Sequence, residues 1–216
     1  MALGGLCHTA VDIHPQDGAC ALFQEACVPL NLPNILTLLR VAAIPLLVLF
    51  AHLGAPWGNW GAAALFGAAA LTDLLDGWLA RRSGQTTAFG AFLDPVADKL
   101  IVATALVLLT ARFDNLLITL AACVVIGREI VVSALREWMA RLGREASVAV
   151  TTVAKIKTTL QMIAISFLLL ILPEQAGTLF FLFMQGVLLV AVMLTLWSMA
   201  VYLRTFFRVI RETDGC

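Results

Sequence analysis

The chain has 216 residues, of which 61% are hydrophobic and 13% are charged, and its mean hydropathy is +0.95. Soluble domains are about a quarter charged, so this composition excludes an ordinary soluble domain and indicates an integral membrane protein. The 14 basic and 14 acidic side chains cancel, which excludes bulk electrostatic attraction to nucleic acid.

Residues 1–30 differ from the rest of the chain. They contain no lysine or arginine, and their apolar runs are too short for a signal peptide. Their cysteines and histidines follow no known metal-ligand spacing, and the whole chain has five cysteines without a CxxC pair. We therefore expect neither a zinc site nor a disulfide framework. We expect residues 1–30 to be a poorly structured extension, either a disordered tail or the product of a start codon assigned too early.

Six segments approach the roughly 20 apolar residues that a membrane-spanning helix needs. They are residues 36–54, 61–80, 95–112, 115–136, 153–172 and 178–204. No strand-type alternation of apolar and polar residues is present. The sequence therefore predicts an all-α bundle of six transmembrane helices, with a membrane domain at 31–208 and a C-terminal tail at 209–216.

Lysine and arginine gather at one set of segment ends, and this asymmetry sets the orientation of a membrane protein. The opposite set of ends offers only Arg112, together with Trp57 and Trp60 as interfacial anchors. The basic side should face the cytoplasm, which places both termini there. Its cations are Arg40, Arg81, Arg82, Arg136, Arg141, Arg144, Lys155, Lys157, Arg204, Arg208 and Arg211.

Two pairs of aspartates flank the short basic loop after the second segment. Asp73 and Asp76 are three residues apart, and Asp94 and Asp98 are four apart. Both spacings place two side chains on one face of a helix, so two antiparallel helices can bring all four carboxylates together near the interface. Such a cluster repels itself unless cations neutralise it. Oxygen ligands suit Mg²⁺ or Mn²⁺, and two ions about 3.5–4 Å apart would stabilise a phosphoryl displacement.

An alternative is a set of solvated aspartates neutralised by Arg81, Arg82 and Lys99. Two glycines favour the metal site over this alternative. Gly77 and Gly90 lie on the carboxylate-bearing stretches, where glycine lowers helix stability but lets a ligand approach the backbone. A nucleotide is a good candidate for that ligand, because Arg81 lies one turn from Gly77 and can form paired hydrogen bonds with a phosphate.

Together these residues resemble the signature of the CDP-alcohol phosphatidyltransferases. That signature reads D-x-x-D-G-x-x-A-R, eight residues, then G-x-x-x-D-x-x-x-D, and it falls here on Asp73, Asp76, Gly77, Ala80, Arg81, Gly90, Asp94 and Asp98. Further segments resemble one branch of the family, the bacterial phosphatidylglycerophosphate synthases, and extend the likeness over Asn31 to Leu203. They are NLPNILTLLR (31–40), FGAFLDPVADKL (89–100), GREIVVSALREWMARLG (127–143), SVAVTTVAKIKTTLQM (147–162) and LTLWSMAVYL (194–203).

The resemblance implies a dimeric six-helix enzyme of the bacterial inner membrane, with its site open to the cytoplasm. It implies transfer of a phosphatidyl group from CDP-diacylglycerol to sn-glycerol 3-phosphate, with release of CMP, in phosphatidylglycerol and cardiolipin synthesis. It implies two Mg²⁺ or Mn²⁺ ions on Asp73, Asp76, Asp94 and Asp98, with Asp98 also the general base. The implied CDP site comprises Gly77, Ala80, Arg81, Gly90, Asn34 and Thr37.

The acceptor's phosphate calls for a basic pocket. The candidate cations are Arg128, Arg136, Lys155 and Lys157, and Thr158 and Thr159 could add hydroxyl donors. Arg128 lies inside an apolar run, where an arginine is a functional candidate, although it could form a structural pair with an acid on a neighbouring helix. The two lysines could instead be positive-inside anchors.

Other functions stay open at this stage. Relatives in the superfamily use serine, inositol phosphate, choline or phosphatidylglycerol as the acceptor. A cation transporter would place acids near the membrane midplane, whereas the aspartates here cluster at one interface.

Overall fold

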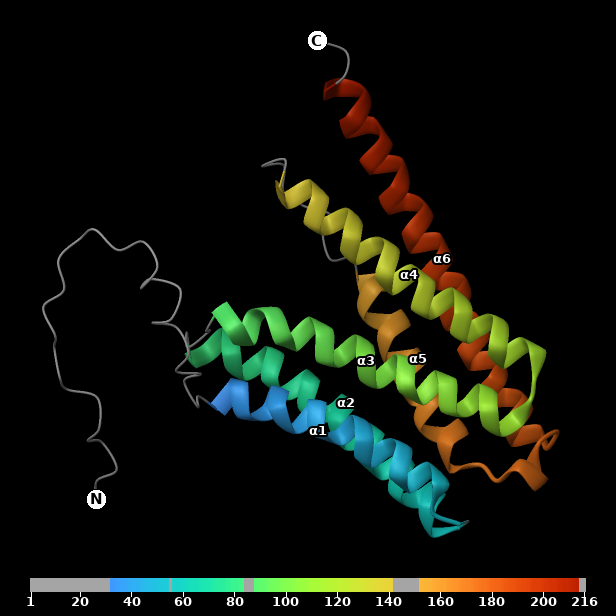
Figure 1. Cartoon of the computed structure of the whole chain (residues 1–216). Coiled ribbons are helices and arrows are strands. Elements are labelled where there is room, and N and C mark those ends of the chain that lie inside the picture. Colours follow the sequence, from blue (N-terminus) through green and yellow to red (C-terminus); the bar gives the residue numbers. More distant parts are fainter. Residues whose placement is uncertain (1–31, 55, 84–87, 142–151, 214–216) are drawn as a thin grey trace, which may run out of the picture. The chain divides into compact units, whose positions relative to one another are not determined.

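The computed structural model describes residues 32–54, 56–83, 88–141 and 152–213. It describes their side chains except at 32–34, 73–92, 94, 136, 140–141, 152–155, 205 and 208–213. Every regular element in these residues is helical, which confirms the all-α prediction. The elements, coloured along the chain in Figure 1, are α1 (Leu32–His52), α2 (Trp57–Ser83), α3 (Ala88–Phe113), α4 (Leu116–Arg141), α5 (Thr152–Leu170), the 3₁₀ turn η2 (Pro173–Gln175) and α6 (Leu179–Thr213).

Several helices run further than hydropathy predicts, and α3 and α6 show this most clearly. α3 begins at Ala88 rather than at residue 95, and α6 continues past residue 204 to Thr213. Polar residues lower the hydropathy of both stretches, but they do not prevent the backbone from remaining helical. The signature positions Gly90 and Asp94 therefore lie inside the first turns of α3.

Three helices are long and apolar enough to cross a membrane, within the part of the chain that the structure describes. The spans are Ile35–His52, Leu116–Met139 and Leu179–Arg204, and Ile156–Leu170 is a shorter apolar stretch. Large apolar side chains face outward on these helices, for example Phe183, Met193 and Trp197 on α6. Water would oppose so much exposed apolar surface, so this surface supports a membrane protein, while the predicted number of six spans is not confirmed.

The helices pack in a closed order that differs from their order in the chain. α1 contacts α2, α2 contacts α5, α5 contacts α6, α6 contacts α4, α4 contacts α3, and α3 returns to α1. α3 also contacts α5 and α2. The core between the helices is built from fully buried apolar side chains such as Leu47, Phe66, Leu106, Ile165 and Leu188.

The turn between α1 and α2 depends on two glycines. A Cβ at Gly58 would lie 1.8 Å from the carbonyl oxygen of Leu53, and one at Gly61 would lie 2.5 Å from the ring of Phe50. The backbones can approach this closely only because glycine has no side chain. This tight turn holds the start of α2 against the end of α1, and so aligns the two helices along their length.

The turn between α3 and α4 is fixed by polar residues. Asp114 has a φ of 43°, a left-handed conformation that aspartate tolerates better than most residues. Asn115 then caps α4, because its side-chain oxygen accepts a hydrogen bond of 2.9 Å from the backbone N–H of Leu117. With this reversal, the C-terminal half of α4 returns to the end of the bundle where α3 begins.

Candidate functional site

Both aspartate pairs lie on continuous helices, as their spacing predicts. Asp73 and Asp76 fall within α2, which ends at Ser83, and Asp94 and Asp98 fall within α3, which begins at Ala88. Helical geometry places the two members of each pair on one face. The side chains of Asp73, Asp76 and Asp94 lie outside the described residues.

Asp98 is held by an ion pair with a helix that lies far from it in sequence. The Nη1 of Arg40 on α1 donates a hydrogen bond to the Oδ1 of Asp98 at 2.5 Å. The side chain of Arg40 is 2% exposed and that of Asp98 is 31% exposed. A buried guanidinium needs such a partner, so Arg40 fixes the carboxylate between the core and an open cavity.

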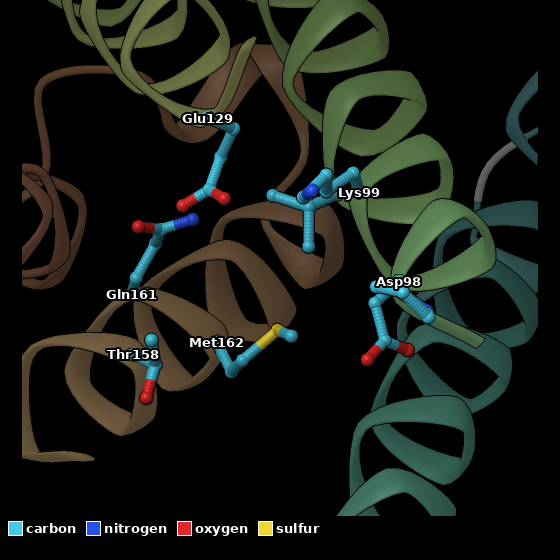
Figure 2. A pocket seen from close by; sticks show the side chains of 8 residues that line it. Asp98, Lys99, Glu129, Thr158, Gln161 and Met162 are labelled. Carbon is cyan, nitrogen blue, oxygen red and sulfur yellow. The ribbon is translucent and has the colours of Figure 1, made fainter. Parts of the chain in front are cut away.

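That cavity lies among α3, α4 and α5 and has a volume of about 250 Å³. Its described lining residues are Pro95, Asp98, Lys99, Val102, Glu129, Thr158, Gln161 and Met162. Figure 2 shows Glu129 and Gln161 near one another on one side, Asp98 on the other, and Lys99 between them in this view. Asp98 and Thr158 are therefore predicted site residues that the structure places in this cavity.

The ammonium of Lys99 is bonded to α4 in the part of the chain that the structure describes. It donates a hydrogen bond to the hydroxyl oxygen of Ser133 on that helix. That hydroxyl in turn donates a bond of 2.7 Å to the backbone carbonyl of Glu129. The alternative interpretation, in which Lys99 neutralises the aspartate cluster, is not tested, because the side chains of Asp73, Asp76 and Asp94 lie outside the described residues.

Two of the predicted acceptor cations have described side chains. Arg128 donates a hydrogen bond to the carboxylate of Glu129, the next residue on α4. The structural pair considered for Arg128 therefore exists, but its partner is on the same helix. Lys157 is buried, with 3% of its surface exposed. Neither residue is among the described residues that line the cavity.

The other predicted site residues are placed by their backbone alone. These residues, of which the structure describes only the backbone, are Asn34, Gly77, Ala80, Arg81, Gly90, Arg136 and Lys155. Thr37, predicted for the CDP site, is buried on α1 one turn before Arg40. No group of three or more histidine, cysteine, aspartate or glutamate side chains forms among the described residues. Three of the four predicted ligands are not among these residues, so the metal prediction is not tested here.

Sequence reasoning missed the local role of several residues. Arg40 was interpreted only as a cation that sets orientation, although its position one turn after Thr37 in an apolar helix was a signal of a buried role. Glu129 and Gln161 line the cavity, and both stand out as polar residues in otherwise apolar stretches.

A second cavity lies between α2 and α5. It has a volume of about 270 Å³, and its described lining is mostly apolar, with Gly67, Leu71, Ile163 and Phe167 among its residues. Thr158 and Met162 line both cavities. The polar cavity therefore adjoins an apolar one, an arrangement that suits an amphiphilic substrate with a charged head group and an apolar chain.

Comparison with known proteins decides the family. The model of the CDP-alcohol phosphatidyltransferase family matches residues 30–198. The chain belongs to the CDP-alcohol phosphatidyltransferase family. The matched region includes the cavity between α3, α4 and α5 as well as Arg40 and Asp98.

Curated relatives in this family are similar over most of their length. The chain is 52% identical over 177 residues to the CDP-diacylglycerol–glycerol-3-phosphate 3-phosphatidyltransferase of Escherichia coli strain K12, which covers 80% of this chain and 93% of the relative. Proteins of the same name from Shigella sonnei and Shigella flexneri are 52% and 51% identical over the same coverage. The resemblance inferred from the signature is thus confirmed.

Proposed function

We propose that the protein transfers the phosphatidyl group of CDP-diacylglycerol to sn-glycerol 3-phosphate and releases CMP. The identity of 52% over 80% of the chain to relatives named for this reaction carries the proposal. The site supports it, because Asp98 lies in a polar cavity that is large enough for a small acceptor. The product, phosphatidylglycerophosphate, would feed phosphatidylglycerol and cardiolipin synthesis.

The reaction needs one bond to form and one to break at phosphorus. The acceptor hydroxyl oxygen attacks the β-phosphorus of CDP-diacylglycerol, the bond to the CMP oxygen breaks, and Asp98 takes the hydroxyl proton. A carboxylate is a weak base for an alcohol, so proton transfer comes late, as the new bond forms. Most of the rate enhancement then arises from positioning. The Arg40 contact serves positioning directly, because it restricts the Asp98 side chain.

Divalent cations fit the donor set of the two helices. Asp73 and Asp76 belong to α2, Asp94 and Asp98 belong to α3, and these two helices contact one another. Hard oxygen donors suit Mg²⁺ or Mn²⁺. When bound, such ions would neutralise the pyrophosphate and stabilise the departing CMP.

The nucleotide would lie beside the same stretches. We assign its site to Asn34, Thr37, Gly77, Ala80, Arg81 and Gly90 by their match to the family signature and to the segment before Arg40. Gly77 and Gly90 would let the nucleotide approach the helix backbone, and Arg81 would contact a phosphate. The diacylglycerol tails would remain in the bilayer, and the apolar cavity between α2 and α5 is a suitable entry for one of them.

We propose glycerol 3-phosphate as the acceptor partly on the size of the polar cavity. A cavity of about 250 Å³ lies just below the roughly 300–1,000 Å³ typical of pockets for drug-sized ligands. It therefore favours a small alcohol over phosphatidylglycerol, whose glycerol carries a whole second lipid. Arg128, Arg136, Lys155 and Lys157 remain candidates for the acceptor phosphate.

The proposed setting is the bacterial cytoplasmic membrane. Three apolar helices support membrane insertion, and we propose that α2, α3 and α5 also span it. The excess of basic residues at one end supports a cytoplasmic active site and cytoplasmic termini. A homodimer is proposed on the family resemblance.

Release of CMP from CDP-diacylglycerol tests the function. Purified protein with Mg²⁺ would receive glycerol 3-phosphate, serine, inositol 1-phosphate or phosphatidylglycerol in parallel. We expect release with glycerol 3-phosphate alone, and its loss when EDTA removes the metal. Release with another alcohol alone would keep the family reaction and overturn the acceptor. No release with any acceptor from folded, metal-supplemented protein would overturn the proposal as a whole.

A further inference from the structure

Among the described residues that line the polar cavity, the charges are not balanced. Two carboxylates line it, and each has an arginine partner that is not among the described lining residues. Asp98 pairs with Arg40, and Glu129 pairs with Arg128. Both carboxylates are therefore already compensated, although they face the cavity.

Lys99 is the cation among the described lining residues, and its described hydrogen-bond partner, Ser133, is uncharged. Among the residues whose side chains are described, no carboxylate lies within ion-pair distance of its ammonium, which donates to the hydroxyl of Ser133. An ammonium has three donors, and Ser133 takes one of them. A partly buried ammonium without an anionic partner among the described side chains is unfavourable, so this cavity is suited to an anion.

The position of Lys99 next to Asp98 defines what kind of anion fits. Successive residues on a helix project about 100° apart, so the charged ends of the two side chains diverge while both line the same cavity. Figure 2 shows the two side chains pointing in different directions from α3. A small molecule bound here would place a hydroxyl near the carboxylate and an anionic group near the ammonium.

We propose that Lys99 binds the phosphate monoester of the acceptor, and so determines specificity for a phosphorylated alcohol over an uncharged one. This inference rests on the proposed function, because it takes Asp98 as the group that faces the reacting hydroxyl. Thr158 and Gln161 supply uncharged polar groups on the α5 side of the cavity. The sequence had pointed instead to cations on α4 and α5, of which Arg128 is engaged by Glu129.

Steady-state kinetics of matched variants test the assignment. Lys99→Gln removes the charge and keeps a donor for Ser133, Lys99→Arg keeps the charge, and Arg204→Gln removes an exposed cation of α6 that does not line the cavity. We expect Lys99→Gln to raise the KM for glycerol 3-phosphate about 10- to 100-fold, the effect of losing one charge-assisted hydrogen bond. Its KM for CDP-diacylglycerol should stay within about twofold of the wild-type value, as should both KM values of Arg204→Gln. Lys99→Arg should recover most of the loss.

A second measurement needs no variant, and decides the matter if Lys99→Gln does not fold. Wild-type protein would be treated with an amine-acylating ester, and the labelling rate of Lys99 followed by peptide mass spectrometry. Glycerol 3-phosphate or inorganic phosphate should slow labelling, and glycerol at the same concentration should not. Equal labelling rates with all three would overturn the role of Lys99.

The outcomes separate this inference from the function on which it rests. Wild-type transfer to glycerol 3-phosphate with an unchanged KM in Lys99→Gln would overturn the Lys99 assignment and leave the proposed function standing. Wild-type transfer only to an unphosphorylated alcohol would overturn both.

Discussion

The two ends of the helix bundle use polar residues in different ways. At the end that holds the α3–α4 turn, uncharged amides and one arginine bond mainly to backbone groups or to each other. Asn59 donates to the carbonyl of Ile171 at 3.3 Å, and Arg112 donates to the carbonyl of Leu169 at 2.8 Å. These bonds satisfy buried backbone carbonyls that would otherwise be left without partners, and they join helices that are distant in sequence.

At the other end, charged groups pair with charged groups around a cavity. The side chains of Arg40 and Arg128 are nearly buried, whereas those of their partners Asp98 and Glu129 are partly exposed. Removing paired charges from water is costly even when they are well bonded. A fold that needed only to join helices could use the neutral bonds of the far end. The difference favours a ligand-binding role for the charged end and a stabilising role for the far end.

The largest expected effect comes from a pair of Asp→Asn substitutions, one at each end. Asp98→Asn should reduce kcat by about 10²–10⁴-fold, the usual contribution of a general base, while CDP-diacylglycerol binding persists. The matched control is Asp114→Asn in the exposed turn after α3, which should leave kcat within about twofold. For both variants, CMP release would give kcat, and a binding measurement on the same preparations would give the affinity for CDP-diacylglycerol. Wild-type turnover by Asp98→Asn would remove the base assignment and the contrast between the ends.

Arginine substitutions at the two ends of the bundle should have the next largest effects. Arg40→Ala removes the described ion-pair partner of Asp98, and breaking a buried ion pair destabilises by about 3–5 kcal/mol. Arg112→Ala removes a bond from a charged donor to a carbonyl, which should destabilise by about 1.5–3 kcal/mol. We expect kcat per folded molecule to fall in Arg40→Ala alone, and Arg40→Lys to restore part of it. Thermal unfolding in detergent and CMP release give the two readings. A normal kcat in folded Arg40→Ala would make Arg40 a purely structural residue.

The contrast between the ends also explains what the sequence could predict. Apolar runs located all six helices, because hydropathy reports burial in lipid or core. Helical spacing placed each aspartate pair on one helix. The boundaries of α3 were missed because Gly90 and Asp94 lower hydropathy in a stretch that is nevertheless helical.

The partners of the charged groups could not be read from the sequence. The Arg40–Asp98 pair joins residues 58 positions apart. Neither segment carries a sequence pattern that identifies the other as its partner. Arg128 stands out in the sequence as an arginine inside an apolar run, but the side chain that it contacts depends on rotamers and helix packing. The same limit hid Lys99, which directly follows Asp98 in the sequence while its described hydrogen-bond partner is Ser133 on α4.

A smaller effect is expected at the α1–α2 turn. Gly58→Ala should lower the free energy of unfolding by about 1–3 kcal/mol, because its Cβ would clash with the carbonyl oxygen of Leu53. The control is Gly54→Ala in the same turn, where a Cβ meets no atom within 4 Å among the described neighbours. Thermal unfolding would separate the two variants. Both should keep the wild-type KM for glycerol 3-phosphate, and a change in that KM would link this turn to the active end.

The smallest effect, and the finest contrast, comes from one substitution made at both ends. Gln185 is buried on α6 and donates to the side-chain oxygen of Asn115 at 2.9 Å, whereas Gln161 is buried on α5 and lines the polar cavity. Gln185→Met should lower the free energy of unfolding by about 0.5–1.5 kcal/mol, the net contribution of one neutral hydrogen bond. Gln161→Met should instead raise the KM for glycerol 3-phosphate by about 3- to 10-fold with little change in stability. Methionine has a similar length and adds no charge, so size and electrostatics are matched at the two positions. If both variants lose only stability, Gln161 supports the bundle as Gln185 does, and the recognition surface of the cavity narrows to Lys99, Asp98 and Thr158.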